Sequence, residues 1–589
     1  MADNIEKSHA NLSGAKKSFE SRVFDSREFS GIGLAGTMRL LKGRFSKFIN
    51  YLGRSVAYTS VRSYGCFALA FGLMTLFLHL GEYYFAENPS IIFSSLIIGA
   101  VLTIVGIPLL FFDKPMCIAL QDMAVTDFLF FEFFSIKRMH RINDSSSPVP
   151  PVLALFLGFI PAVIAFFVPP YIVLLVLVLS AALIVAFISP EFPMIFSLLV
   201  LPYTFFIPNA DVVLAILSAV SFVSFGGKVI LGKRVYNFRI YDAVITFIFV
   251  MMLVSGIVSS RENSFVDSVL LVAIMHGYFP AANLIVNRRL ADCAVNALTV
   301  SSVPVCILAI IEFFIELPGG VEPPSYSTPG ISSVFENQPA LASFLLICGV
   351  FTFGFAQEKT HRGKKIAVYG VFALILATLL LTLDVGVLVA IVFALFAYAA
   401  ITTKKIPVDL ALIFVVIAHL VFLIPAGFLD TISTFFGMER SFSELLSGAS
   451  VGLGTFLSNA LIGVGAGSEQ AAESNLLLGV GVAFGASVLI AFVLLIVLRL
   501  RHISYYRTFV RNSPVKTTLR MSQLALVCIL VYGAYYSVLS EISILYVFSV
   551  TFGIGTAMLN IAKNEHDDRM GYYGQLTSFD SAELDVALR

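Results

Sequence analysis

The feature that most constrains this chain is a series of long apolar segments, each about as long as a lipid bilayer is thick. A membrane-spanning helix needs about 17–25 mainly apolar residues. Inside lipid every backbone polar group must be bonded within the protein, so only helices or closed barrels can cross. The alternation typical of barrel strands is absent, and the sequence therefore predicts an all-α polytopic membrane protein with about 16 transmembrane helices. The predicted spans are 65–81, 91–112, 152–169, 171–189, 194–208, 211–227, 241–259, 267–286, 298–315, 340–356, 366–383, 386–402, 407–427, 475–498, 519–538 and 542–562.

Composition supports the same class. Hydrophobic residues make up 58% of the chain and charged residues only 13%, with a mean hydropathy of +0.92. A soluble domain carries about 25% charged residues. The first apolar segment follows roughly sixty polar and basic residues, a pattern that does not fit a cleavable signal peptide. The six cysteines lie in or beside apolar segments with no CxxC spacing, so we expect neither disulfides nor a metal site, and no cofactor.

The basic residues predict an orientation. If the N-terminus is cytoplasmic and all sixteen segments cross, then all but two of the 38 Lys and Arg residues fall on the cytoplasmic side. The two exceptions are Arg261 and Arg440. Cytoplasmic loops of membrane proteins carry such an excess of basic residues. The sequence thus predicts a multi-pass plasma-membrane protein with both termini in the cytoplasm.

Three parts of the chain are expected to behave differently. Residues 1–64 form a cytoplasmic tail, 65–562 the membrane domain, and 563–589 a polar, disordered cytoplasmic tail. Residues 38–52 place apolar side chains at helical spacing with Lys and Arg at the border. We expect an amphipathic helix that lies on the anionic cytoplasmic leaflet, in preference to a nucleic-acid-binding segment.

Two long loops on the predicted outer face are the places where chemistry is expected, since loops of such length are usually functional or disordered. They span about 316–339 and 428–474. The first ends with Glu336, Asn337 and Gln338 immediately before a proline, which favours the first turn of a helix. A helix N-terminus offers backbone donors to an anion such as phosphate, and a plain Asn337 cap is the alternative.

The second loop leads into a glycine-rich stretch, residues 460–485. Its "GVGAG" segment is not a dinucleotide fingerprint, because no strand precedes it. We expect these glycines to allow tight turns or a close approach to a ligand or helix. Gly481 and Gly485 are four residues apart, a spacing typical of small residues where membrane helices touch.

Four stretches carry a family resemblance. They are "FENQPALASFL" from Phe335, "TLDVG" from Thr382, "ALIGVGAG" from Ala460 and "SNLLLGVGVAFG" from Ser474. Their order, spacing and placement resemble the O-antigen ligase/polymerase superfamily of bacterial envelope proteins, over roughly residues 150–560. The resemblance implies an all-helical, metal-independent transferase for surface-polysaccharide biosynthesis. Such a glycosyltransferase moves a polyprenyl-pyrophosphate-linked glycan onto an acceptor at the outer membrane face.

The resemblance also implies site residues. The family's histidine falls at Ser474, and its hairpin arginine falls at Val385, directly after Asp384. We expect Arg440, the one basic residue in either long loop, to contact phosphate. Asp384 is either a base that replaces the histidine or a solvated helix end.

The remaining cavity-lining residues are expected to come from the two loop ends. These substrate-binding residues are Glu336, Asn337, Gln338, Ser474 and Asn475.

Two other functions stay open. The loss of the family's histidine and arginine favours a catalytically inactive scaffold in a complex with other glycan-assembly proteins. A transporter or flippase is the third hypothesis. His79, His276 and His419 lie within predicted spans, where ionisable groups are functional candidates, although a packed neutral histidine is equally common. The sequence shows neither an internal hydropathy repeat nor a matched pair of broken helices, which disfavours transport.

Overall fold

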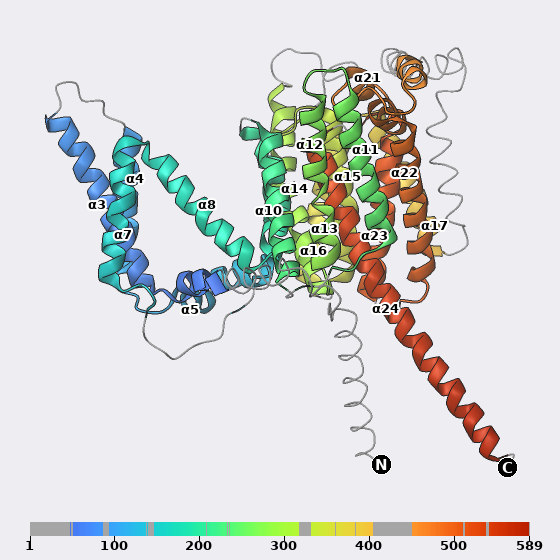
Figure 1. Cartoon of the computed structure of the whole chain (residues 1–589), viewed down its shortest axis with the longest axis horizontal. Coiled ribbons are helices and arrows are strands. Elements are labelled where there is room, and N and C mark those ends of the chain that lie inside the picture. Colours follow the sequence, from blue (N-terminus) through green and yellow to red (C-terminus); the bar gives the residue numbers. More distant parts are fainter. Residues whose placement is uncertain are drawn as a thin grey trace, which may run out of the picture.

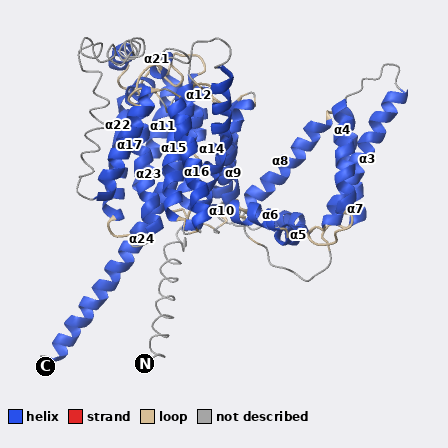
Figure 2. Cartoon of the chain, turned by 180° about the vertical axis from the view of Figure 1, so that it is seen from behind, coloured by secondary structure: helices blue, strands red, loops and turns tan. Residues whose placement is uncertain are grey.

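A computed structural model describes most of the chain, and the described part is all-α. The described residues are 47–48, 51–85, 93–136, 138, 147–207, 209–231, 234, 236–316, 331–359, 361–382, 384–403, 450–510, 513–537 and 541–587. Within these ranges the only β feature is one isolated bridge, between Ser60 and Pro115. Helices account for most of the described chain (Figure 2). The predicted span 407–427, Arg440 and nearly all of the 38–52 segment lie outside the described residues.

The described helices confirm a polytopic membrane protein. Eleven of them are long and apolar enough to cross a bilayer, and each coincides with a predicted span. Four further predicted spans fall on shorter apolar helices, Ser95–Leu109, Pro151–Phe167, Glu191–Thr204 and Gly386–Thr402. The total of sixteen spans remains a prediction. The eleven longer helices are Val61–Gly81, Pro170–Ile188, Ala210–Ile230, Ile240–Val258, Ser264–Leu284, Arg288–Ile315, Gln338–Glu358, Arg362–Leu381, Leu476–Arg507, Pro514–Tyr532 and Ile542–His566.

The first helices form an arm beside the main bundle (Figure 1). The helices α3 (Val61–Phe85), α4 (Phe93–Leu109) and α7 (Pro151–Phe167) pack together, and α8 (Pro170–Ile188) leads from them to the bundle. Their small core contains Phe71, Ala162, Ala165 and Val173. Most of the remaining apolar side chains of the arm are exposed, as expected of a surface that faces lipid. Between α4 and α7 lie α5 (Met116–Asp122), α6 (Ala124–Thr126) and the π-helix Asp127–Phe133.

The bundle surrounds three central helices. In the membrane-spanning windows of α15 (Gln338–Glu358), α23 (Ser513–Tyr532) and α24 (Ile542–Ala587), 89%, 89% and 94% of the residues are buried. Around them pack α9 (Glu191–Val200), α10 (Ala210–Ile230), α11 (Ile240–Val258), α12 (Ser264–Met275), α13 (Tyr278–Leu284), α14 (Arg288–Glu316), α16 (Arg362–Leu381), α17 (Val385–Thr403) and α22 (Leu476–Arg507). The 3₁₀-helix Leu201–Phe206 continues α9.

The helix α24 extends far beyond the bundle, at the end opposite the short helix α21 (Glu469–Ala472) (Figure 1). It continues to Ala587 and so includes most of the segment 563–589, for which composition predicts disorder.

The glycine-rich stretch folds into a broken helix that is held by a returning loop. Within α22, Gly485 has φ 82° and ψ 177°, a conformation that is essentially restricted to glycine. Gly463, Gly465 and Gly467 of the loop also have positive φ, which confirms the expected tight turns. Three backbone hydrogen bonds join the loop to the break: Val464 N to Val482 O (2.8 Å), Gly465 N to Ala483 O (2.9 Å) and Ala486 N to Ala460 O (2.7 Å).

The loop therefore bonds backbone groups that a continuous helix would satisfy by itself. A Cβ on Gly485 would lie 2.5 Å from the carbonyl oxygen of Leu461. The expectation that Gly485 packs against a neighbouring membrane helix is wrong: it packs against this loop. Gly481 faces the ring of Phe456, which belongs to the helical residues 450–458.

Candidate functional site

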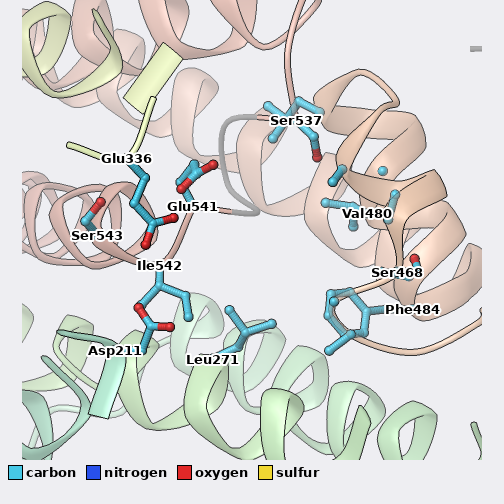
Figure 3. Close-up of a pocket in the computed structure, with 17 residues that line it drawn as sticks. Asp211, Leu271, Glu336, Ser468, Val480, Phe484, Ser537, Glu541, Ile542 and Ser543 are labelled. Carbon is cyan, nitrogen blue, oxygen red and sulfur yellow. The ribbon is translucent and has the colours of Figure 1, made fainter. Parts of the chain in front are cut away.

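The site is a pocket of about 300 Å³ at the end of the bundle that carries α21 (Figures 1 and 3). Its walls come from the starts of α10, α15, α22 and α24, together with the loop that precedes α21. These four helices all begin at the same end of the bundle, so residues far apart in sequence meet there. Ligand pockets typically measure about 300–1,000 Å³, and this one is of the smaller kind.

One wall of the pocket is acidic. Asp211 is the second residue of α10, Glu336 lies in the turn before α15, and Glu541 directly precedes α24. Figure 3 shows the three carboxylates on the same side of the pocket. None of the described residues that line the pocket is Lys, Arg or His. The pocket is therefore a concentration of negative charge at the ends of apolar helices.

The opposite wall is built by the first turns of α22 and the loop before it (Figure 3). Val480 and Phe484 contribute an apolar surface, and Leu271 of α12 adds to it. Phe484 directly precedes the break at Gly485, so the break and its loop set the position of this wall. The pocket thus joins an acidic side to an apolar side, an arrangement that suits a ligand with both characters.

Two serines of the pocket have unused hydrogen-bonding capacity. The side chains of Ser468 and Ser543 line the pocket and are only 4% and 1% exposed. Among the described residues, neither hydroxyl has a hydrogen-bond partner. Buried polar groups in native proteins are nearly always bonded. Both hydroxyls therefore have capacity for a further hydrogen bond beside the pocket.

The environment of Glu541 disfavours its charged form. Burial raises the pKa of the Glu541 carboxyl above its ordinary value, and the nearby carboxylates of Glu336 and Asp211 raise it further. A hydrogen bond from the Asn337 side-chain amide to Glu541 Oε1, 2.6 Å long, opposes this shift. Folding thus brings together like-charged carboxylates that lie far apart in an unfolded chain.

Arg261, one of the two basic residues predicted to lie outside the cytoplasm, lies at the rim of this pocket. Its guanidinium donates a hydrogen bond to the carbonyl of Ala466 and lies 3.7 Å from the Asp267 carboxylate. A Cβ on Gly467 would lie 2.3 Å from Arg261 Nη1. Ala466 and Gly467 both line the pocket. Only the folded loop brings this arginine to the glycine motif, and no sequence spacing indicates the contact.

The first group of expected site residues divides between pocket and scaffold. Glu336 lines the pocket, as expected of a cavity residue. Asn337 caps α15 by accepting a hydrogen bond from the backbone N–H of Ala340 at 2.8 Å, and it also holds Glu541. Gln338 donates from Nε2 to the carbonyl oxygen of Thr382 at 2.6 Å, so it joins the α16–α17 turn to α15.

The second group positions α22 without lining the pocket. Asn475 caps the helix by accepting a hydrogen bond from the backbone N–H of Leu478 at 2.8 Å. Ser474 is buried, and its hydroxyl donates to the carbonyl oxygen of Gln470 at 2.6 Å. Both residues lie beside the pocket wall that Leu476 begins.

Asp384 lies apart from the pocket, in the turn before α17. Only 8% of its surface is exposed, so it is not a solvated helix end. It accepts hydrogen bonds from the Tyr532 hydroxyl and from the backbone N–H of Gly386, both at 2.7 Å. Burial raises the pKa of the Asp384 carboxyl, and these hydrogen bonds oppose the rise. Arg440 lies outside the described residues.

The two described intramembrane histidines are packed. The ring of His276 lies against Phe222, Phe249 and Phe279, and its Nδ1 is 2.6 Å from a backbone carbonyl. His79 forms a similar backbone contact at 2.9 Å. His419 lies outside the described residues. These contacts favour packing over ion coupling for both rings.

The pocket offers carboxylate acceptors, free hydroxyls and an apolar face to a ligand with hydroxyl or ammonium groups. Within the described part of the chain, no group of three or more His, Cys, Asp or Glu residues is arranged to hold a metal ion. Neither a protein-family model nor a curated protein matches the chain, so its function has to be inferred from the pocket itself.

Proposed function

We propose that this protein takes part in surface-polysaccharide assembly as an O-antigen ligase- or polymerase-like transferase. Its donor is a polyprenyl-pyrophosphate-linked glycan at the outer face of a bacterial plasma membrane. One observation supports this proposal most: three stretches that carry the resemblance line a single pocket. They contribute Glu336, the Ala466–Gly467 pair, and the α22 wall from Leu476 to Phe484.

The position of the pocket suits a lipid-linked substrate. It begins at the helix starts and reaches Phe484, nine residues into α22, which is about 12 Å at 1.5 Å per residue. A glycan head can enter such a pocket from the membrane surface while its polyprenyl tail stays in the bilayer. In the proposed orientation both termini are cytoplasmic and the basic segments face an anionic leaflet.

The described residues suggest roles for the transfer step. A pocket carboxylate, Glu336 or Glu541, would take the proton of the acceptor hydroxyl. Arg261 at the rim, and Arg440 as the resemblance implies, would stabilise charge on the departing pyrophosphate. The site has few cations for this task, and an inactive scaffold that binds the same glycan therefore remains the alternative form of the proposal.

Transport is the second candidate, and the break in α22 favours it. Transporters bind substrates at discontinuous helices, but near the bilayer midplane and usually at paired breaks in two repeats. Here the pocket lies at the helix starts. Flux of a lipid-linked glycan across proteoliposomes would support transport over transfer.

The proposal is tested by deleting the gene in its own host and restoring wild type or single variants. Lipid-linked glycans are extracted and the surface polymer is sized. We expect deletion to accumulate lipid-linked precursor and to shorten or remove the polymer. Wild type and Glu262→Gln, an exposed acidic residue that does not line the pocket, restore both.

Glu336→Gln and Arg440→Ala are expected to restore neither polymer nor precursor level. If both variants restore them fully, the protein acts as a scaffold rather than a transferase. If deletion changes neither precursor nor polymer, the proposed function is wrong.

A further inference from the structure

We propose that the acidic pocket binds a primary ammonium group on a hydroxyl-bearing ring, that is, an amino sugar with a free amine. This inference rests on the proposed function and names the chemical class of the glycan residue that enters the pocket. It concerns binding, so it can be tested without any transfer assay.

The charge of the pocket selects a cation. Asp211, Glu336 and Glu541 face the same space, and no ion pair joins any of them to a described Lys, Arg or His. Bringing three carboxylates together in a partly buried site is unfavourable without a counter-charge. An ammonium ligand supplies that charge, whereas a phosphate would add to the repulsion.

The acceptors also match the donors of an ammonium group. A primary ammonium carries three N–H donors and no acceptor. The carboxylates on this wall provide acceptors for such donors, and charge-assisted hydrogen bonds of this kind are roughly twice as strong as neutral ones. Asn337 engages only Oε1 of Glu541, so Oε2 remains available to a ligand.

The two unpartnered serines are an independent sign of a polar ligand. Ser543 lies beside the acidic wall and Ser468 on the opposite wall (Figure 3), and both hydroxyls are buried without a partner among the described residues. A hydroxyl group on a bound ring would offer a partner to the serine on the wall that it reaches. A simple alkylamine would leave them unsatisfied, at a cost comparable to a lost hydrogen bond.

The apolar wall opposite the acidic one suits the ring of a sugar. Val480, Phe484 and Leu271 offer apolar contact for the C–H face of a sugar. A volume of about 300 Å³ suits one such ring rather than an oligosaccharide. A bare metal ion would use neither this wall nor the volume, and the described acidic residues are not arranged as metal ligands.

The test uses the purified full-length protein in detergent at pH 7 and three probes that differ at one carbon. D-Glucosamine carries the ammonium, D-glucose a hydroxyl and N-acetyl-D-glucosamine a neutral amide. Binding is measured by calorimetry and by the rise of the unfolding temperature with probe concentration, with sodium chloride matching the counter-ion. We expect D-glucosamine to bind at least about tenfold more tightly than either neutral sugar.

Variants locate the site. Glu336→Gln and Asp211→Asn each remove a charge at nearly constant shape, and we expect each to weaken D-glucosamine binding about tenfold. Glu262→Gln is the matched control and is expected to change nothing. Ser543→Ala is expected to weaken all three sugars alike. Two charge variants allow for the failure of one to fold.

Equal binding of the three sugars, no binding, or stabilisation by magnesium or calcium chloride alone would overturn this inference. So would D-glucosamine binding that survives both charge variants. These results are distinct from failure of the proposed function, which is read from precursor and polymer in the deletion strain. If the protein prefers D-glucosamine but its deletion leaves the polymer intact, the inference about the pocket stands and the proposed function is wrong.

Discussion

The two ends of the bundle treat their carboxylates in opposite ways. At the end opposite α21, Glu358 is only 6% exposed at its side chain, and Arg288 binds it at 2.8 Å. Glu191 at the same end is paired with Arg234. At the α21 end, the three pocket carboxylates have no such partner among the described residues. The chain therefore pairs Glu191 and Glu358 with arginines at one end, whereas at the other end Asp267 is paired with Arg261 and the three pocket acids have no such partner among the described residues.

This difference separates structural carboxylates from functional ones. A buried carboxylate that only joins helices needs a nearby cation or hydrogen-bond donors, because an unpaired charge away from water is costly. The bundle meets this need where α14 and α15 come together. Leaving acids unpaired in the pocket is understandable if a ligand brings the missing charge. The comparison also predicts that substitutions at the two ends change stability in opposite directions.

The largest expected effect comes from the pocket wall rather than from any charge. Gly485→Ala forces a side chain into a glycine-only conformation and against the Leu461 carbonyl oxygen. We expect a loss of about 3 kcal/mol in the free energy of unfolding, and loss of D-glucosamine binding. Gly370→Ala in α16 is the control, since a Cβ there meets nothing within 4 Å. An unchanged unfolding temperature would show that the break in α22 is not required.

At the paired end, Arg288→Met should destabilise the protein. It leaves Glu358 without its cation, and we expect a cost of about 2 kcal/mol, moderated because the Arg288 side chain is 35% exposed. Thermal unfolding in detergent measures the loss. The double variant Arg288→Met/Glu358→Leu is expected to recover part of it, because the buried Glu358 charge is gone while Asp292, 3.5 Å from Arg288 in wild type, still loses its cation. If the single variant is neutral, the pair has no structural role and the comparison fails at this end.

At the unpaired end, Glu541→Gln should be neutral or stabilising, with a dependence on pH. The raised pKa of Glu541 means that the folded protein binds this proton more tightly than the unfolded chain. Stability from this group is therefore present at low pH and is lost as the pH rises above the ordinary carboxyl value. In unfolding measurements made from about pH 4 to 8, we expect wild type to lose stability relative to Glu541→Gln as the pH rises above the ordinary glutamate pKa of about 4.3. If the stability of wild type and of Glu541→Gln changes with pH in the same way across that range, the carboxylates do not repel one another as we infer.

Much of the fold follows from sequence because hydropathy and helix caps act locally. Fifteen of the sixteen predicted spans coincide with apolar helices, and the sixteenth lies outside the described residues. The sequence predicts Asn337 as a possible helix cap, and it caps α15; Asn475, which the sequence predicts as a substrate-binding residue, caps α22. Positive φ at the glycines of "GVGAG" likewise follows from residue type alone.

The site was harder to predict because its residues meet only through tertiary structure. Asp211 and Glu541 belong to no motif and lie 330 positions apart in the numbering, so no local pattern connects them. Arg261 contacts Ala466 across a separation of 205 positions. The break at Gly485 depends on the returning loop for its hydrogen bonds, and Gly481 and Gly485 alone indicate ordinary helix packing.

The smallest expected effect concerns Asp384, which represents a third way to hold a carboxylate. Among the described residues no cation pairs with it, it does not line the acidic pocket, and donors from Tyr532 and Gly386 bind it instead. Asp384→Asn disturbs these hydrogen bonds, and we expect a loss of about 1 kcal/mol in stability. D-Glucosamine binding and restoration of the surface polymer should be unchanged, because Asp384 does not line the pocket. Loss of polymer at normal stability and normal D-glucosamine binding would instead make Asp384 the base that the family resemblance implies. The pocket acids would then bind the glycan without taking its proton.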